Sequence, residues 1–445
     1  MGSWRASAGG AAGRQHGWSR RRFLQAMALG GAAVLLGSGG RVVRADHPGA
    51  WVKDPSAFRQ FPTNLETRLE TIRDSWITPI DRFFVRNNVP STPHIDPAGY
   101  RLRVSGDAVE QEIELSLSDL QRMPQRTVVT QLECAGNWRS FSQLPEFHGQ
   151  KSRGGQWGPG AIGLAEWTGV PLREVLNAAG VRENAVDVLL IGLDEDAPEG
   201  GFQRAIPLEV ARDEDTLLAL AMNGQELPPD HGYPVRAVVP GWVGSNSIKW
   251  LGYIEVLSER AWTRNTTTSY VLIGDPWPAP EGAPEGAAGA PVSHQTVKSA
   301  LALPIGWEPV ADGMDPTPAR LPAGPQRVVG FASPGGGFDW GSPDMAGRLP
   351  APQWGRKPLP RIVRVEWRVD DGDWQEATLI DEPTPGNWVR FEFEWEAIPG
   401  RYTLYTRATA EDAEGNVYTQ PDAVPFNGKG YLYNQILPHP VEVEG

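Results

Sequence analysis

Residues 130–141 read Thr130-Gln131-Leu132-Glu133-Cys134-Ala135-Gly136-Asn137-Trp138-Arg139-Ser140-Phe141, and they contain the only cysteine of the 445-residue chain. Ala135 and Gly136 are small enough to let a bulky group approach the backbone beside this cysteine. Asn137 and Arg139 offer hydrogen-bond donors to an anion at the same place. A lone cysteine can also be an inert buried thiol. These neighbours favour the other interpretation, in which Cys134 binds something.

The first 45 residues have the features of a targeting segment. They hold seven arginines and no acidic residue, and the run Arg20-Arg21-Arg22-Phe23-Leu24 precedes a short apolar stretch at residues 26–36. That stretch is too short to span a bilayer with ease, so stable membrane insertion after cleavage is not expected. Paired arginines before Phe-Leu are typical of the bacterial twin-arginine signal, which exports folded proteins with their cofactor already inserted. We therefore expect a periplasmic protein with residues 1–45 as its signal peptide.

The charge of the chain limits its partners. The formal net charge is −13. A chain that began near Asp46 would carry −20, because loss of the first 45 residues removes seven arginines and no acidic residue. Nucleic acid is therefore not expected as a ligand, whereas a basic soluble protein would be attracted. An exported protein with one cysteine has no internal disulfide, and a bare thiolate outside the cytoplasm would oxidise. Metal binding would protect it.

Hydrophobic patterning predicts a mixed α/β architecture before residue 280. Residues 46–78 are expected to form an irregular surface segment. Strands are predicted at residues 80–88, 100–104, 112–117, 127–132 and 186–193, so that Cys134 follows a strand end. Helices are predicted at residues 168–179, with Thr168 as N-cap and Gly180 as stop, and at residues 209–220, followed by a turn at residues 222–225.

A second group of chemically notable residues comes later in the chain. His231, Arg236 and Lys249 flank apolar strands and glycine turns. Inside an acidic protein, three such residues together favour an inward-facing site for a phosphate. Ordinary surface charge is the alternative interpretation.

The C-terminal part of the sequence is different in kind. Residues 281–300 are predicted to be a linker because of their Gly, Ala and Pro content. Beyond them, strands are predicted at residues 327–332, 362–369, 375–380, 389–395 and 401–410. Alternation within residues 362–369 places Val363, Val365, Trp367 and Val369 on one face. Short alternating strands predict an immunoglobulin-like β-sandwich over residues 301–445.

Seven short segments follow one another within residues 75–435: Phe83-Phe84-Val85-Arg86-Asn87, Cys134-Ala135-Gly136-Asn137, Gly192-Leu193-Asp194, Met222-Asn223-Gly224, His231-Gly232-Tyr233-Pro234-Val235-Arg236, Ser247-Ile248-Lys249-Trp250 and Phe426-Asn427. With these segments in this order, the chain resembles the sulfite oxidase family of molybdenum enzymes. The resemblance implies an α+β protein, with a mixed α/β molybdopterin-binding catalytic domain at residues 46–280 followed by the β-sandwich, through which the family usually dimerises.

The resemblance also implies roles for individual residues. Cys134 would be the thiolate ligand of molybdenum, which suits a sulfur-rich metal site. The pterin and its phosphate would be held by Phe84, Val85, Arg86, Asn87, Asn88, Asp194, His231, Arg236, Ser247, Ile248 and Lys249. The substrate would be bound and converted beside Arg86, Arg139, Trp157, Tyr270 and Lys429. Three positions depart from the family pattern: Asn88 replaces a frequent histidine, and Trp138 and Lys429 replace frequent arginines.

The activity implied is oxidation of sulfite, or a similar small anion, to sulfate by oxygen-atom transfer. Electrons would pass to an external acceptor such as cytochrome c, because the chain has no Cys-x-x-Cys-His motif and no haem is expected in it. A reductase of S-oxides or N-oxides on the same scaffold is the alternative activity. A third interpretation is a binding protein without cofactor, in which Cys134 is structural.

Overall fold

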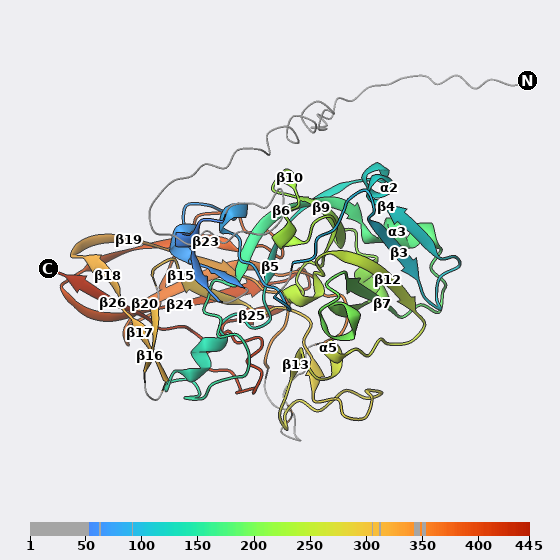
Figure 1. Cartoon of the computed structure of the whole chain (residues 1–445). Coiled ribbons are helices and arrows are strands. Elements are labelled where there is room, and N and C mark those ends of the chain that lie inside the picture. Colours follow the sequence, from blue (N-terminus) through green and yellow to red (C-terminus); the bar gives the residue numbers. More distant parts are fainter. Residues whose placement is uncertain are drawn as a thin grey trace, which may run out of the picture. The chain divides into compact units, whose positions relative to one another are not determined.

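The structure, a computed structural model, describes residues 53–61, 64–90, 92–304, 306–310, 313–341, 348 and 353–445, without the side chains of residues 306–310 and 313–316. These residues belong to one compact unit, Val42–Gly445. Figure 1 shows its elements in chain order. The predicted signal peptide lies outside the described residues. Within the described part of the chain, no helix is both long and apolar enough to cross a membrane.

A five-stranded sheet carries the cysteine. Its order is β10-β9-β6-β5, with β11 paired to β9, and its strands are β5 (Arg126–Glu133), β6 (Ile162–Pro171), β9 (Leu217–Met222), β10 (Gln225–Glu226) and β11 (Arg236–Val238). Because Glu133 pairs with Ile162 at the last position of the β5–β6 ladder, Cys134 leaves the sheet at a fixed point. The predicted strand before the cysteine is confirmed.

A second, mixed sheet lies in the same half of the chain. Its order is β4-β3-β12-β7-β8, formed by β3 (Arg101–Ser105), β4 (Ile113–Ser116), β7 (Asp187–Gly192), β8 (Gln203–Pro207) and β12 (Leu251–Leu257). Only the β3–β12 pair is parallel. Helix α3 (Leu172–Ala179) buries Leu172, Val175, Leu176 and Ala179 in one core with these strands. It ends at Gly180, whose φ of 68° suits glycine. The predicted mixed α/β class is confirmed.

The remaining helices of this half are short. They are α2 (Leu117–Arg122), α4 (Leu208–Ala211) and α5 (Arg264–Thr267), with 3-10 turns at Pro55–Ala57, Leu69–Thr71, Ile80–Arg82, Arg139–Gln143, Pro198–Gly200, Pro229–His231 and Gly244–Asn246. The predicted N-cap Thr168 is wrong, because Thr168 lies within β6 and Pro171 precedes the helix. The helix predicted at residues 209–220 is confirmed only at residues 209–211, which belong to α4, and is wrong beyond them. A short apolar run fits either a helix or a buried strand, and here its second half is β9.

The segment before residue 90 differs from its prediction. It includes the strands β1 (Phe58–Gln60) and β2 (Leu65–Thr67), and Lys53 is buried rather than on the surface. Residues 80–88 form a 3-10 turn and a single bridge between Val85 and Leu65 instead of a strand. The Lys53 ammonium donates to the carbonyl oxygens of Ile80 and Phe83, so a side chain satisfies backbone groups that a strand partner would otherwise pair.

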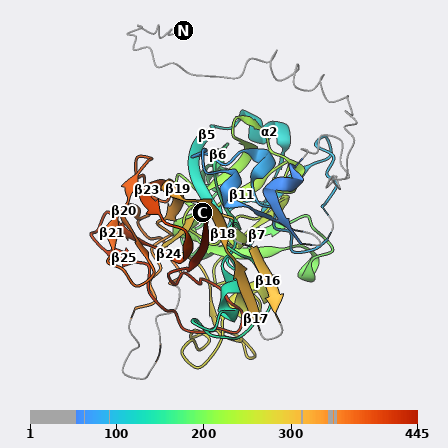
Figure 2. The same cartoon turned by 90° about the vertical axis from the view of Figure 1, so that its left-hand side faces the viewer.

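The C-terminal half is two packed sheets, as Figures 1 and 2 show. One sheet has the order β15-β19-β23-β22, from β15 (Lys298–Leu301), β19 (Gly324–Ser333), β22 (Thr378–Leu379) and β23 (Val389–Ala397). The other has the order β18-β26-β24-β20-β21, with β25 on β24, from β18 (Ala319–Pro322), β20 (Arg361–Val369), β21 (Gln375–Glu376), β24 (Gly400–Glu411), β25 (Val417–Thr419) and β26 (His439–Glu444). Between them Trp367 stacks on Phe393 at 4.1 Å. The predicted β-rich half is confirmed, and its immunoglobulin-like topology stays a prediction.

Two details of this half differ from the prediction. A register shift between Ile362 and Arg364 turns Ile362 inward and leaves Val363 37% exposed. The second part of the predicted linker is not an exposed tether. Strand β14 (Ala290–Pro291) pairs with β13 (Val271–Leu272), and residues 292–302 are buried. Strands β16 (Gly306–Val310) and β17 (Gly313–Thr317) form a separate antiparallel pair.

Two buried histidines, His294 and His439, should make the stability of the protein depend on pH. Burial lowers the pKa of His439 and of His294 to about 3, and the Nε2 atom of His439 accepts from the Leu301 amide at 3.2 Å. Since the unfolded chain binds these protons near pH 6.5, acid favours unfolding. Each histidine should lower the free energy of unfolding by ~1.4 kcal/mol per pH unit between about pH 6.5 and 3. Urea unfolding at several pH values measures this slope. In a His439→Gln variant the slope of unfolding free energy against pH should be smaller by the contribution of one histidine. An unchanged slope would mean that His439 is not neutral in the folded protein.

Candidate active site

A cavity opens beside Cys134. Its empty volume is about 710 Å³ with the open mouth included. Its lining comes from five separate regions of the sequence, at residues 83–88, 134–135, 194–202, 230–250 and 270. The lining residues are Phe83, Phe84, Arg86, Asn88, Cys134, Ala135, Asp194, Phe202, Asp230, His231, Arg236, Gly244, Ser245, Ser247, Ile248, Lys249, Trp250 and Tyr270.

The loop that carries Cys134 is held by its backbone. The Cys134 amide donates to the Ala161 carbonyl at 2.9 Å, and the Asn137 amide donates to the Cys134 carbonyl at 2.9 Å. A Cβ atom at Gly136 would lie 2.5 Å from a guanidinium nitrogen of Arg139, so a larger residue there would displace that side chain. The loop therefore presents one thiol, 9% exposed, to the cavity.

One end of the cavity is a buried group of cations. Burial lowers the pKa of Arg236 to about 9 and that of Lys249 well below its ordinary value. The Lys249 ammonium donates to the Asp230 carbonyl at 2.9 Å and to the Asn87 amide oxygen. Among the described residues no carboxylate forms an ion pair with Arg236 or Lys249, and Arg236 Nε and Ser245 Oγ have no hydrogen-bond partner. Such a group is costly without an anion. The surface-charge interpretation is wrong.

Lys53 reaches the same group from the N-terminal segment. Its Nζ atom lies 2.8 Å from Nε2 of His231. Burial lowers the pKa of Lys53 to about 8, and burial together with Lys53 holds the pKa of His231 well below its ordinary value. Sequence reasoning missed Lys53, because a single lysine in a polar stretch gives no signal of burial.

Around the thiol, an arginine and a phenol face each other. Nη2 of Arg86 lies 3.3 Å from the Tyr270 hydroxyl. Although burial opposes the charge, attraction to Tyr270 and Cys134 keeps the pKa of Arg86 above its ordinary value. The Tyr270 ring stacks on Tyr431 at 5.4 Å, and the Arg139 guanidinium lies 4.9 Å from the centre of the Tyr431 ring. Burial raises the pKa of Tyr431 to about 12. Tyr431 was missed, although it is two residues beyond Lys429.

Five of the predicted site residues do not line the cavity: Val85, Asn87, Arg139, Trp157 and Lys429. Asn87 acts through Lys249, as described above. Val85 packs with Phe58 and Leu65, and Trp157 packs against Phe61 at 4.9 Å within the apolar cluster that contains Cys134.

Arg139 and Lys429 are connected to each other. Arg139 Nε donates to the Lys429 carbonyl at 2.7 Å, and Arg139 Nη1 donates to the Gly155 carbonyl at 2.9 Å. The Lys429 ammonium donates to the Thr268 carbonyl at 2.9 Å, outside the cavity lining. Lys429 therefore contributes to the site through its backbone.

This geometry gives a prediction for Lys429. Replacing it with alanine keeps the carbonyl that Arg139 needs and removes only a partly exposed charge. We expect the Michaelis constant for an anionic substrate to change by less than about threefold. Steady-state kinetics at low salt tests this. An increase of tenfold or more would place the ammonium on the substrate after all.

Comparisons with known proteins agree with this geometry. Residues 89–264 match the family described as "Oxidoreductase molybdopterin binding domain". Mitochondrial sulfite oxidase of Rattus norvegicus is 34% identical over 395 residues, which cover 84% of this chain and 63% of that protein. Sulfite oxidase of Gallus gallus is 33% identical over 404 residues, covering 87% of this chain and 76% of that protein.

A solved structure shares the fold. The sulfane dehydrogenase SoxCD from Paracoccus pantotrophus superimposes with a TM-score of 0.65 and 24% identity, over 92% of this chain and 96% of that chain. The chain thus spans less than two thirds of the rat relative and nearly all of this structural neighbour.

Proposed function

The chain belongs to the sulfite oxidase family of molybdopterin-dependent oxidoreductases, and from that premise we propose that it oxidises sulfite to sulfate. The proposal rests on one observation. The single thiol of the chain, a cation group that forms no ion pair with any described carboxylate and the Arg86–Tyr270 pair all face one cavity. The thiol and the cation group fit a metal cofactor that carries a phosphate. The Arg86–Tyr270 pair fits a small oxyanion beside the metal.

The residues present fit the cofactor. Cys134 would hold molybdenum, and His231, Arg236 and Lys249 would surround the phosphate, whose oxygens would satisfy Arg236 Nε and Ser245 Oγ. Among the described residues no group of three His, Cys, Asp or Glu side chains could hold a metal ion, so the remaining ligands would come from the cofactor. When bound, molybdenum supplies oxygen-atom transfer and takes up the two electrons removed from sulfite.

The protein's own contribution is to attract and orient the anion. The Arg86 guanidinium offers a rigid fork to sulfite oxygens, and the Tyr270 hydroxyl adds a donor next to it. Tyr431 and Arg139 support Tyr270 from behind in a stack. Overall, sulfite and water give sulfate, two protons and two electrons, and the electrons leave to an external acceptor.

The acceptor, the location and the assembly are parts of the same proposal. A basic cytochrome c suits a chain with a formal charge of −20 after loss of residues 1–45. Those residues would direct export of the loaded protein to the periplasm. A homodimer through the C-terminal sheets would follow the usual pattern of the family.

Purified protein loaded with molybdenum tests the activity. We expect reduction of ferricyanide and of cytochrome c that depends on sulfite, with a molybdenum(V) signal in electron paramagnetic resonance during titration. S-oxides and N-oxides are offered in parallel with a reduced dye. Reduction of these compounds without oxidation of sulfite would favour the alternative activity and remove this proposal.

A further inference from the structure

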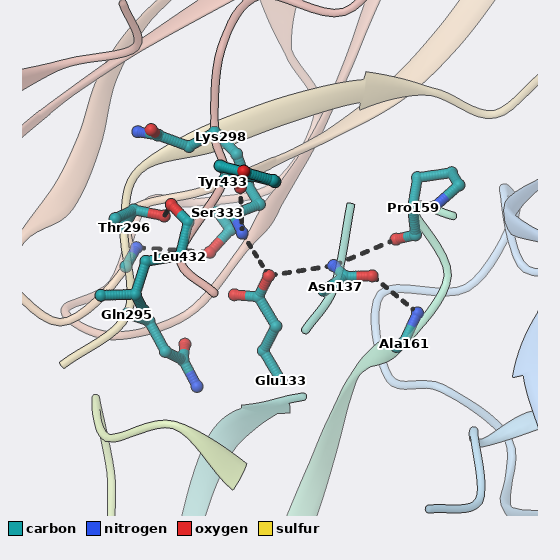
Figure 3. A network of polar contacts seen from close by, with 12 residues as sticks. Glu133, Asn137, Pro159, Ala161, Gln295, Thr296, Lys298, Ser333, Leu432 and Tyr433 are labelled. Atoms are coloured by element: carbon teal, nitrogen blue, oxygen red, sulfur yellow. Dashed lines mark hydrogen bonds and ion pairs between the residues drawn. The ribbon is translucent and has the colours of Figure 1, made fainter. Parts of the chain in front are cut away.

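A buried ion pair lies directly beside the cysteine loop. The Lys298 ammonium donates to Oε1 of Glu133 at 2.5 Å, and the side chains are only 7% and 3% exposed. Glu133 is the last residue of β5 and precedes Cys134, whereas Lys298 begins β15 in the C-terminal half. Figure 3 shows Glu133 between Asn137 on one side and Lys298 on the other. The pair therefore joins the two halves of the chain at the loop that carries the thiol.

The carboxylate of Glu133 closes the loop on itself. The same Oε1 atom accepts from Nδ2 of Asn137 at 2.9 Å, and the Asn137 side-chain oxygen accepts from the Ala161 amide at 3.0 Å. Residues 133 and 137 flank the cysteine, so this bridge fixes both ends of the turn between them. Without the carboxylate, Nδ2 of Asn137 would keep only the longer bond to the Pro159 carbonyl at 3.3 Å.

Lys298 also holds the residue after the turn. Trp138 has a φ of 73°, a left-handed conformation that is unfavourable for a bulky residue. The Lys298 ammonium lies 5.4 Å from the centre of the Trp138 ring, within the range of a cation–π interaction. One ammonium therefore contacts groups at both ends of the cysteine loop.

The pair further connects the loop to the segment that carries Tyr431. Lys298 donates to the Tyr433 carbonyl at 3.2 Å, and the Leu432 amide donates to the Ala135 carbonyl at 3.1 Å. Tyr431 in turn stacks on Tyr270. The same contacts thus locate the thiol and one wall of the proposed substrate site.

We propose that Glu133 and Lys298 are positioning residues that aim the Cys134 thiol into the cofactor cavity and keep Tyr431 against Tyr270. The purpose of this arrangement rests on the proposed function, but the arrangement itself can be tested without turnover. A buried ion pair is rarely needed for stability, because apolar residues of similar size often replace one at no cost. Its place at the thiol favours positioning.

The test uses alkylation of the full chain without cofactor by iodoacetamide, followed by mass spectrometry. Cys134 is the only cysteine, so one added group identifies the site. In Lys298→Met we expect alkylation at least about tenfold faster than in the wild type, because the loop opens.

The control and the double variant separate positioning from charge balance. Arg320→Met removes an exposed ion pair with Glu444 at 3.1 Å and should leave alkylation unchanged. Glu133→Met/Lys298→Met removes both buried charges and should melt near the wild-type temperature, yet still be alkylated fast. If the double variant returns to the slow rate, or if Lys298→Met matches Arg320→Met, the proposal is wrong. The double variant also supplies the test if Lys298→Met fails to fold.

In the loaded enzyme, the double variant should lose about 10- to 100-fold in kcat with a smaller change in KM, because a metal ligand and a substrate wall are displaced. The molybdenum(V) spectrum should shift with it. If the wild type does not oxidise sulfite but Lys298→Met is alkylated faster than the wild type, the proposed function is wrong and the positioning role remains. If the wild type oxidises sulfite but alkylation is equally slow in both proteins, the positioning role is wrong and the proposed function remains.

Discussion

Replacing Cys134 with serine is expected to abolish sulfite oxidation while the protein stays folded. The loop is held by the amide of Cys134 and by the bonds of Asn137, so the exchange of sulfur for oxygen removes none of these contacts. A serine hydroxyl stays protonated and is a poor ligand for a metal in sulfur-rich surroundings. Even residues that only support a metal ligand can cost up to ~10²-fold, so losing the ligand should cost at least that much in kcat.

Cofactor content decides how this result is interpreted. The cation group at the other end of the cavity, where we propose that the phosphate binds, is untouched in Cys134→Ser. Pterin should therefore be retained when molybdenum and pterin are measured separately. The melting temperature should stay within a few degrees of the wild type. Turnover at the wild-type rate by a folded serine variant would remove Cys134 as the metal ligand and with it the proposed function.

The chemistry-bearing side chains could be found from the sequence because their types are unusual in their surroundings. Cys134 is unique in the chain, and His231, Arg236 and Lys249 are cations between apolar strands of an acidic protein. The strand before Cys134 was predictable for a local reason, since its β-branched residues favour an extended backbone. In both cases the signal lies within a few residues of the site.

The parts that the sequence did not reveal depend on contacts between distant residues. Lys53 pairs with His231 across 178 positions, and Lys298 pairs with Glu133 across 165. Neither lysine stands in a motif, and Lys298 lies in a stretch that its composition marked as a linker. Lys429 shows the opposite case. The resemblance implies contact with substrate, whereas in the structure its carbonyl holds Arg139 and its ammonium donates to the Thr268 carbonyl, so its role stays a prediction.

Replacing Arg236 with methionine is expected to affect the loaded and the empty protein in opposite directions. In the empty protein the buried guanidinium donates to the His231 carbonyl at 3.1 Å and leaves Nε without a partner among the described residues. Burial already lowers its pKa to about 9, which shows that the charge is unfavourable there. Methionine fills similar space without that penalty, so the empty variant should melt at the same or a higher temperature.

With cofactor bound, the same guanidinium would pair with the phosphate, and its loss should weaken cofactor binding by about 2–4 kcal/mol, or about 30- to 1,000-fold. Pterin retained after dialysis measures binding, and thermal unfolding of the empty protein measures stability. Arg101→Met, which removes an exposed pair with Glu114 at 3.5 Å, serves as the control and should change neither quantity. If Arg236→Met is destabilised both with and without cofactor, Arg236 supports the fold. Opposite signs mean that this cation is kept at a cost to the empty protein because an anion binds it.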